Sequence, residues 1–140
     1  MTREEKLNHL IDILRARDEK SLRMRLWFTQ PPVDKRGLSS HYDPDNLKQM
    51  DCNTVACAGG WACLDPTFNA LGLNFDFQDS HPTYEDELGF EALQKFFELD
   101  VDADEYTEVY RIFDAGEYTL GGEATVNDVI TRIEEIRDGK

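Results

Sequence analysis

The 140-residue sequence has no apolar run that approaches the roughly 20 residues of a membrane-spanning helix, and its first residues form no apolar targeting segment. It also has no glycine-rich phosphate loop, no His-Glu-x-x-His pair and no Gly-x-Ser-x-Gly turn. The common motifs of nucleotide-binding proteins, zinc proteases and serine hydrolases are therefore missing. We expect a cytoplasmic protein with a single domain over residues 1–140, because single cores of this length are common.

Cysteine and histidine are scarce, with three of each. The cysteines all lie in one stretch, CNTVACAGGWAC, at residues 52–63. An odd number of cysteines without a targeting segment favours reduced thiols over a disulfide framework. A four-ligand zinc site would need His41 or His81 as well, and one helix would direct Cys57 and Cys63 to different faces. We therefore predict no metal site and no cofactor.

Basic residues are scarce in the second half of the chain. The net charge is −14, from 29 acidic and 15 basic residues. Residues 1–74 hold ten of each, so the remaining 19 acids and five bases lie in residues 75–140. A field of this sign repels nucleic acid and anionic membranes and favours basic partners. The alternative is that the acidity serves only solubility.

Hydrophobic periodicity favours a mainly α-helical, compact small domain with one short two-stranded β element. Helices are expected over residues 2–19, 84–99, 103–115 and 125–137, with one further turn over 67–73. Gly116 is the expected C-cap of the third of these helices. The strands are expected over 22–28 and 74–78. Residues 31–51 are rich in Pro, Gly, Ser, Asp and Asn and predict a long polar loop.

Threonine marks the start of the first and last of these helices. Thr2 is the expected N-cap of the first helix, and Thr125 with Asp128 forms an approximate capping box for the last. The cysteine stretch itself reads as a helix that Asp51, Asn53 or Thr54 would cap. Its small residues would let neighbouring backbones approach closely, so we interpret it as a core helix.

A nucleophilic thiol is the main alternative for this stretch. Cys52 would lie near a helix N-terminus, where a thiol pKa falls, and His41 in the 31–51 loop would serve as its base. This small-enzyme or ligand-binding hypothesis is opposed by the acidic background, which disfavours a thiolate, and by the absence of a family-specific nucleophile signature. We therefore favour a non-enzymatic protein.

The acidic residues on the predicted helices of the second half form the candidate binding surface. A rigid array of carboxylates resembles the phosphate backbone that attracts Lys- and Arg-rich clefts. We expect this array to bind a host protein, with inhibition or DNA mimicry of a basic, nucleic-acid-binding protein as its specific forms. A homodimer is the alternative, in which the basic end of the first helix meets the acidic half of a second copy. The candidate residues are Glu85, Asp86, Glu87, Glu91, Glu98, Asp102, Asp104, Glu105 and Glu108.

The segment CNTVACAGGWA, residues 52–62, resembles a motif of an uncharacterised family of small phage and bacterial proteins, approximately Cys-Gly-Thr-x-Ala-Cys-x-x-Gly-(Trp or His)-Ala. In that family an apolar segment with Met, ending in Trp, precedes the motif, as in Met24 to Trp27. An aromatic Phe and a final apolar helix follow it, as in Phe113 and Val126 to Ile136. Asn53 stands where Gly is usual. The resemblance implies a phage or mobile-element origin and assigns no activity to any residue.

Overall fold

The structure is a computed structural model that describes residues 1–17, 22, 28–29, 55–76, 81–100, 107–119, 121 and 124–139. These residues form a mainly helical domain with two small antiparallel sheets. The helices are α1 (Arg3–Arg15), α3 (Ala58–Leu64), α4 (Pro66–Ala70), α5 (Phe90–Phe97), α6 (Thr107–Phe113), the 3-10 helix η2 (Ala115–Glu117) and α7 (Val126–Arg137). The strands are β1 (Phe28–Thr29), β2 (Val55–Ala56), β3 (Asn74–Asp76), β4 (His81–Tyr84) and β5 (Glu87–Leu88).

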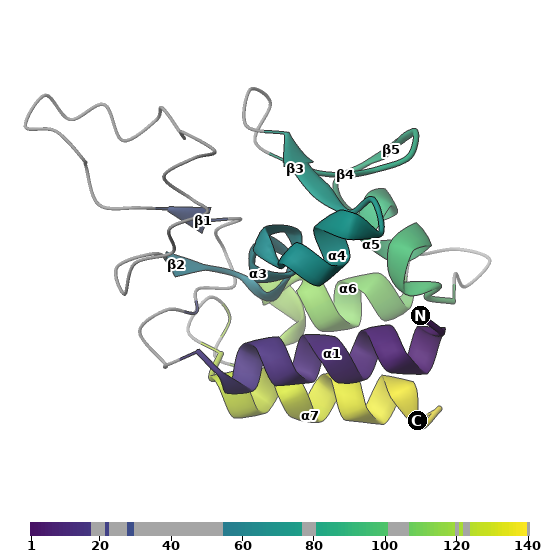
Figure 1. Cartoon of the computed structure of the whole chain (residues 1–140). Helices are drawn as coiled ribbons and strands as arrows, with labels where there is room; N and C mark the ends of the chain where they lie inside the picture. The colour runs from purple at the N-terminus through teal and green to yellow at the C-terminus, as the bar shows by residue number, and fades with distance from the viewer. Residues whose placement is uncertain are drawn as a thin grey trace, which may run out of the picture.

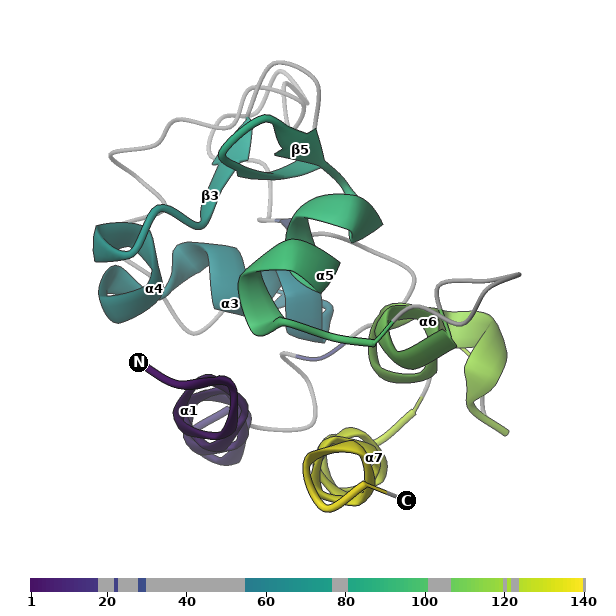
Figure 2. The ribbon, with the colours of Figure 1, turned by 90° about the vertical axis from the view of Figure 1, so that its right-hand side faces the viewer.

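The domain is layered. Helices α1 and α7 lie side by side and antiparallel, so both chain termini are at the same end (Figure 1). Turned by 90°, the two helices are seen along their axes, with α3, α5 and α6 above them and the sheet of β3, β4 and β5 beyond (Figure 2). Within the described residues, no helix has the length and apolar character needed to cross a membrane.

Aromatic side chains fill the centre of the core. Phe68 of α4 meets Phe96 of α5 edge-on, with ring centroids 4.9 Å apart, and Phe97 lies at 5.7 Å from Phe113 of α6. All four rings are almost fully buried, as is Trp61 of α3. An edge-to-face pair such as Phe68–Phe96 stabilises a fold by about 0.5–1.5 kcal/mol beyond its buried area. The rings therefore join α3, α4, α5 and α6 in one core.

The first and last helices begin as predicted. The Thr2 hydroxyl accepts from the backbone N–H of Glu5, and the Glu5 carboxylate accepts in return from the Thr2 N–H. The same reciprocal capping box joins Thr125 and Asp128 at the start of α7. The predicted apolar face of α7 is confirmed, because all its members are buried: Val126, Val129, Ile130, Ile133 and Ile136.

The helix predicted through the whole cysteine stretch is wrong at its start. Val55–Ala56 is a strand that pairs with Phe28–Thr29, and α3 begins only at Ala58. Cys57 is the N-cap, with extended backbone and its Sγ accepting from the Gly60 N–H at 3.4 Å. Val55 is β-branched and favours extended backbone. The Cys57 Sγ accepts one of the free N–H groups at the start of α3, so the helix begins after Cys57. The proposed caps Asp51, Asn53 and Thr54 lie outside the described residues.

The helix predicted over residues 84–99 is also corrected. Residues 81–88 form the β4–β5 hairpin, and α5 begins only at Phe90. Two positive φ angles explain the break, because Glu85 (φ 55°) makes the tight turn and Gly89 (φ 64°) precedes the helix. Apolar Leu88 matched the helical spacing, yet it is 54% exposed on β5.

The predicted pairing of residues 22–28 with 74–78 does not occur among the described residues. Instead β1 pairs with β2, while β3 pairs with β4 in the order β3–β4–β5. Leu22 makes an isolated parallel bridge to Ala56. Gly116 lies within η2, where Asp114 provides the cap, and so it does not end α6 as a C-cap. The predicted loop 31–51, with His41, and also Cys52, fall outside the described residues.

Replacing Thr125 with Ala removes the hydroxyl of the α7 capping box and is expected to lower the free energy of unfolding by about 1 kcal/mol. Urea denaturation followed by circular dichroism measures the loss. Thr131→Ala, at an exposed position of the same helix, is the control, because it removes a hydroxyl without touching the cap. Equal effects of the two substitutions would contradict the importance of the cap.

Candidate functional site at the acidic hairpin

The structure places six of the nine predicted carboxylates; Asp102, Asp104 and Glu105 lie outside the described residues. Glu85 and Asp86 form the turn of the β4–β5 hairpin and Glu87 begins β5, so these three residues are on a hairpin and not on the predicted helix. Glu91 lies in the first turn of α5. We call Glu85, Asp86, Glu87 and Glu91 the hairpin cluster.

One lysine holds the tip of the hairpin cluster. Lys95 Nζ, from the last turn of α5, lies 2.8 Å from Glu85 Oε2 and 3.1 Å from Asp86 Oδ1. Its hydrogen bonds to these two carboxylates raise the pKa of Lys95, and its ammonium group lowers the pKa of Asp86 through the same contact. The ion pair links the tight turn to the last turn of α5 on the protein surface.

The other two carboxylates of the cluster are crowded together. The Glu87 and Glu91 side chains share a hydrogen bond, which raises the pKa of Glu87, with further contributions from desolvation and from the charge of Asp86. Two carboxyl groups can share a hydrogen bond only if one of them carries a proton, so each opposes ionisation of the other. The contact between Glu87 and Glu91 therefore opposes full ionisation of this pair.

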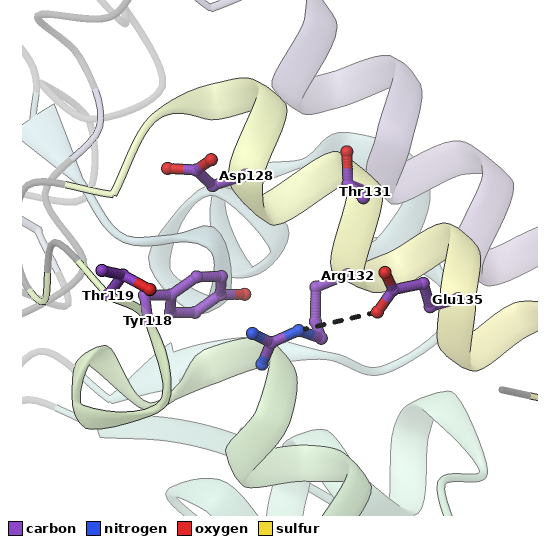
Figure 3. A pocket seen from close by; sticks show the side chains of 6 residues that line it. All are labelled: Tyr118, Thr119, Asp128, Thr131, Arg132 and Glu135. Carbon is purple, nitrogen blue, oxygen red and sulfur yellow. Dashed lines mark ion pairs between the residues drawn. The ribbon is translucent and has the colours of Figure 1, made fainter.

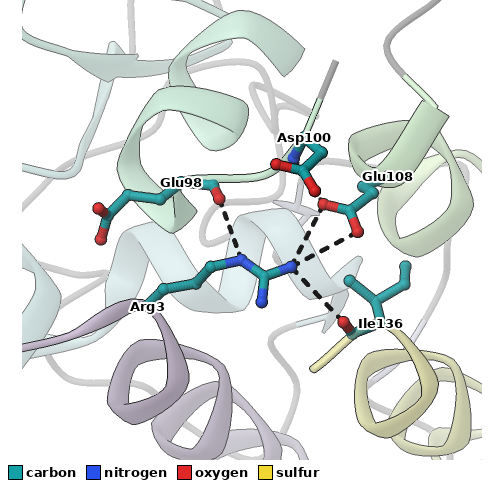
Figure 4. Close-up of polar contacts among 5 residues, drawn as sticks. All are labelled: Arg3, Glu98, Asp100, Glu108 and Ile136. Atoms are coloured by element: carbon teal, nitrogen blue, oxygen red, sulfur yellow. Dashed lines mark hydrogen bonds and ion pairs between the residues drawn. The ribbon is translucent and has the colours of Figure 1, made fainter. Parts of the chain in front are cut away.

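Glu98 and Glu108 belong to a separate polar site, built around Arg3 of α1 (Figure 4). Arg3 Nε donates to the Glu98 carbonyl oxygen at 3.0 Å, and its Nη2 donates to Glu108 Oε1 at 3.3 Å and to the Ile136 carbonyl at 3.5 Å. The Glu108 carboxylate also accepts from the Asp100 N–H. Arg3 therefore connects α1 to the ends of α5, α6 and α7.

Sequence reasoning did not identify this role of Arg3. Lys6 adds a hydrogen bond to the Phe96 carbonyl at 2.8 Å and lies 3.6 Å from the Glu98 carboxylate. These contacts make the Glu108 carboxylate, whose side chain is 17% exposed, part of the internal structure. The Glu98 side chain is 57% exposed, as open to solvent as Glu85 at the hairpin tip.

A polar pocket of about 410 Å³ lies between α7 and the residues after η2 (Figure 3). The Arg132 guanidinium stacks 4.7 Å above the Tyr118 ring and donates to the carbonyl oxygens of Arg111 at 2.6 Å and Glu117 at 3.1 Å. The Tyr118 hydroxyl is directed inward and donates to the Ile112 carbonyl. Burial raises the pKa of Tyr118. The hydrogen-bond donors of Arg132 and Tyr118 are therefore bonded to backbone carbonyl oxygens of the protein itself.

The cysteine stretch shows no activated thiol among its described residues. Cys57 and Cys63 are both buried. Burial raises the pKa of Cys57 to about 11 and raises that of Cys63 well above its usual value. Among the described residues, no group of three or more His, Cys, Asp and Glu side chains is arranged to hold a metal ion.

Two histidines lie within ordered elements. His9 of α1 lies with its Nε2 2.9 Å from Asp65 Oδ2 and its ring edge-on to Phe68 at 4.8 Å. The same Asp65 oxygen caps α4 by accepting from the Phe68 N–H. His81 begins strand β4. His9 thus joins α1 to the junction of α3 and α4.

The chain matches no protein-family model, no curated protein and no solved structure. The functional interpretation therefore rests on the geometry and charge described above.

Glu87→Gln is expected to raise the urea midpoint slightly at pH 7. Because the folded state raises the pKa of Glu87, it favours the protonated form, so the ionised carboxylate weakens the fold above that pKa. The gain should disappear as the pH falls and the wild-type carboxyl is protonated. Asp86→Asn is the opposite control, because its pKa is lowered and the stability that it contributes is present at pH 7 and lost in acid. A midpoint that falls in Glu87→Gln at pH 7 would contradict the crowding of Glu87 and Glu91.

Native Cys57 and Cys63 are expected to resist a disulfide reagent such as DTNB at pH 8 and to react only after denaturation, because both thiols are buried and protonated at that pH. Peptide mapping by mass spectrometry assigns each modified cysteine and reports Cys52 separately. Rapid labelling of Cys57 in the native protein would contradict this description of α3.

Proposed function

We propose that this protein is a non-enzymatic, acidic interaction protein that binds a basic protein through the acidic second half of its chain. Charge complementarity is the physical basis, because a surface of one sign accelerates association with the opposite sign and opposes wrong partners. The hairpin cluster is the part of this surface with a defined geometry. A basic, nucleic-acid-binding host protein is the specific partner proposed, with inhibition or DNA mimicry as the consequence.

The observation that carries the proposal is the imbalance of charge that remains after the ion pairs are formed. The four described basic residues of the second half all lie within ion-pair distance of a carboxylate: Lys95, Arg111, Arg132 and Arg137. Residues 75–140 nevertheless hold 19 acids against five bases. The crowding of Glu87 and Glu91, which raises the pKa of Glu87, supports a concentration of acidic groups at the hairpin.

The resemblance of residues 52–62 to small phage and bacterial proteins extends the proposal to a phage or mobile-element protein acting in the host cytoplasm. The competing enzyme hypothesis depends on Cys52 and His41 in or beside the 31–51 loop. The buried thiols of Cys57 and Cys63 give that hypothesis no further nucleophile. We therefore retain the interaction protein as the favoured function.

Affinity purification at low salt, followed by mass spectrometry, is expected to recover a basic protein. The purified pair should lose affinity by about tenfold or more when the salt concentration rises from about 0.05 M to about 0.5 M, because salt screens exposed charges. Competition with duplex DNA for the same partner, measured by fluorescence anisotropy, identifies DNA mimicry.

The double substitution Glu87→Gln with Glu91→Gln should weaken this binding several-fold. Glu4→Gln with Asp12→Asn is the control, since it also removes two carboxylates, but from the exposed face of α1. An affinity that is independent of salt, or the absence of any basic partner, would contradict the proposed function.

A further inference from the structure

The polar pocket between α7 and the residues after η2 has a carboxylate toward each end (Figure 3). Asp128 and Glu135 are seven residues apart on α7, close to two helical turns, so they project from the same side of the helix. At a rise of about 1.5 Å per residue, their backbones are separated by about 10 Å along the helix axis. Arg132 lies between them, and Tyr118 and Thr119 line the pocket from the other side.

The donors of this pocket already have partners within the fold. The Arg132 guanidinium donates to two backbone carbonyl oxygens and stacks on the Tyr118 ring, and the Tyr118 hydroxyl donates to a third carbonyl. An anionic ligand would have to compete with these carbonyl oxygens for Arg132. It would also lie close to the carboxylates of Asp128 and Glu135, so the pocket is poorly suited to an anion.

The acceptors of the pocket, in contrast, have capacity to spare. Asp128 Oδ2 accepts from the Thr125 N–H at 2.9 Å, whereas Oδ1 accepts no hydrogen bond from any described residue. Glu135 Oε2 lies 3.8 Å from Arg111 Nη2 and 4.0 Å from Arg132 Nε, and both distances exceed that of a hydrogen bond. An ionised carboxylate has about four acceptor sites, so both groups can receive further donors. The pocket therefore favours a ligand with positive charge and N–H donors.

The spacing of these groups restricts the shape of such a ligand. One metal ion cannot bind both carboxylates, because an ion such as Ca²⁺ needs its oxygen ligands within about 2.6 Å. The Arg132 guanidinium between them repels a cation that lies at the centre of the pocket. A ligand with a charge at each end and an uncharged chain between them avoids this repulsion. Each terminal ammonium group of an aliphatic diamine supplies three N–H donors, as the lysine side chain does.

We propose that this pocket binds a linear aliphatic polyamine, with one terminal ammonium group at Asp128 and the other at Glu135. The site is separate from the hairpin cluster and does not depend on the proposed function. A single exposed ion pair contributes little to binding. Affinity therefore requires that both ends engage at once, which only a chain long enough to span the two carboxylates can do.

The terminal diamines of propane and of octane serve as probes, because they carry equal charge and differ in length. Each is titrated into the ¹⁵N-labelled full chain at about 0.05 M salt and followed through amide chemical shifts. The octane diamine is expected to bind about fivefold more tightly than the propane diamine, because it reaches both carboxylates. Its shifts should be centred on residues 118–119 and 128–135.

Glu135→Gln should abolish this preference for the longer diamine. Glu134→Gln is the matched control, because the Glu134 side chain has the same 44% exposure and also pairs with one arginine of α7, but does not line the pocket. This control should keep the fivefold preference. Asp128→Asn tests the other end and serves if Glu135→Gln does not fold, since the Asn carbonyl can still accept from the Thr125 N–H. Circular dichroism establishes the fold of each variant before the titration.

Equal affinity of the two diamines for the wild-type chain would overturn the two-ended site. A preference that persists in Glu135→Gln or disappears in Glu134→Gln would overturn the assignment to these residues. Shifts confined to residues 81–91 would show that the diamines bind the hairpin, which overturns the polyamine pocket and leaves the proposed function unaffected.

Discussion

The packing of Phe96 and Phe97 is the constraint on which most of the structure depends. These neighbouring residues of α5 are both almost fully buried, and their rings contact Phe68 of α4, Tyr84 of β4 and Phe113 of α6. Removing a buried phenylalanine typically costs about 3–5 kcal/mol, a large fraction of the stability of a small domain. Helix α5 is thereby fixed against several elements at once.

The position of α5 determines the position of the acidic surface. Lys95 is one residue before Phe96 and holds the hairpin tip through Glu85 and Asp86. Glu91 lies on the same helix beside Glu87. Helix α5 therefore contributes to both the aromatic core and the hairpin cluster: Phe96 and Phe97 are buried, whereas Lys95 and Glu91 contact side chains of the β4–β5 hairpin.

Local signals predicted the parts of the fold that are locally determined. The Thr2 and Thr125 caps and the apolar face of α7 each follow from residues within a single helix and its cap, and all are confirmed. The hairpin was missed because Leu88 matched the helical spacing of Leu93 and Phe96. Glu85 has a positive φ, a conformation in which glycine is the usual residue, so its identity does not predict the turn. Lys95, which pairs with Glu85 across the turn, lies on the next helix, α5. The role of Arg3 was likewise hidden, because its partners are about one hundred residues away.

The charge excess of the second half could be read from composition, but its division between internal and available carboxylates could not. Glu108 is 17% exposed and pairs with Arg3 of α1, and only the structure separates it from the exposed carboxylates of Glu85, Asp86 and Glu98. Hydrogen exchange of the complex with the captured basic partner tests this division most directly. We predict added protection of the amides of residues 84–91 and unchanged exchange along α1 and α7. Protection confined to α1 and α7, with none at the hairpin, would contradict the account.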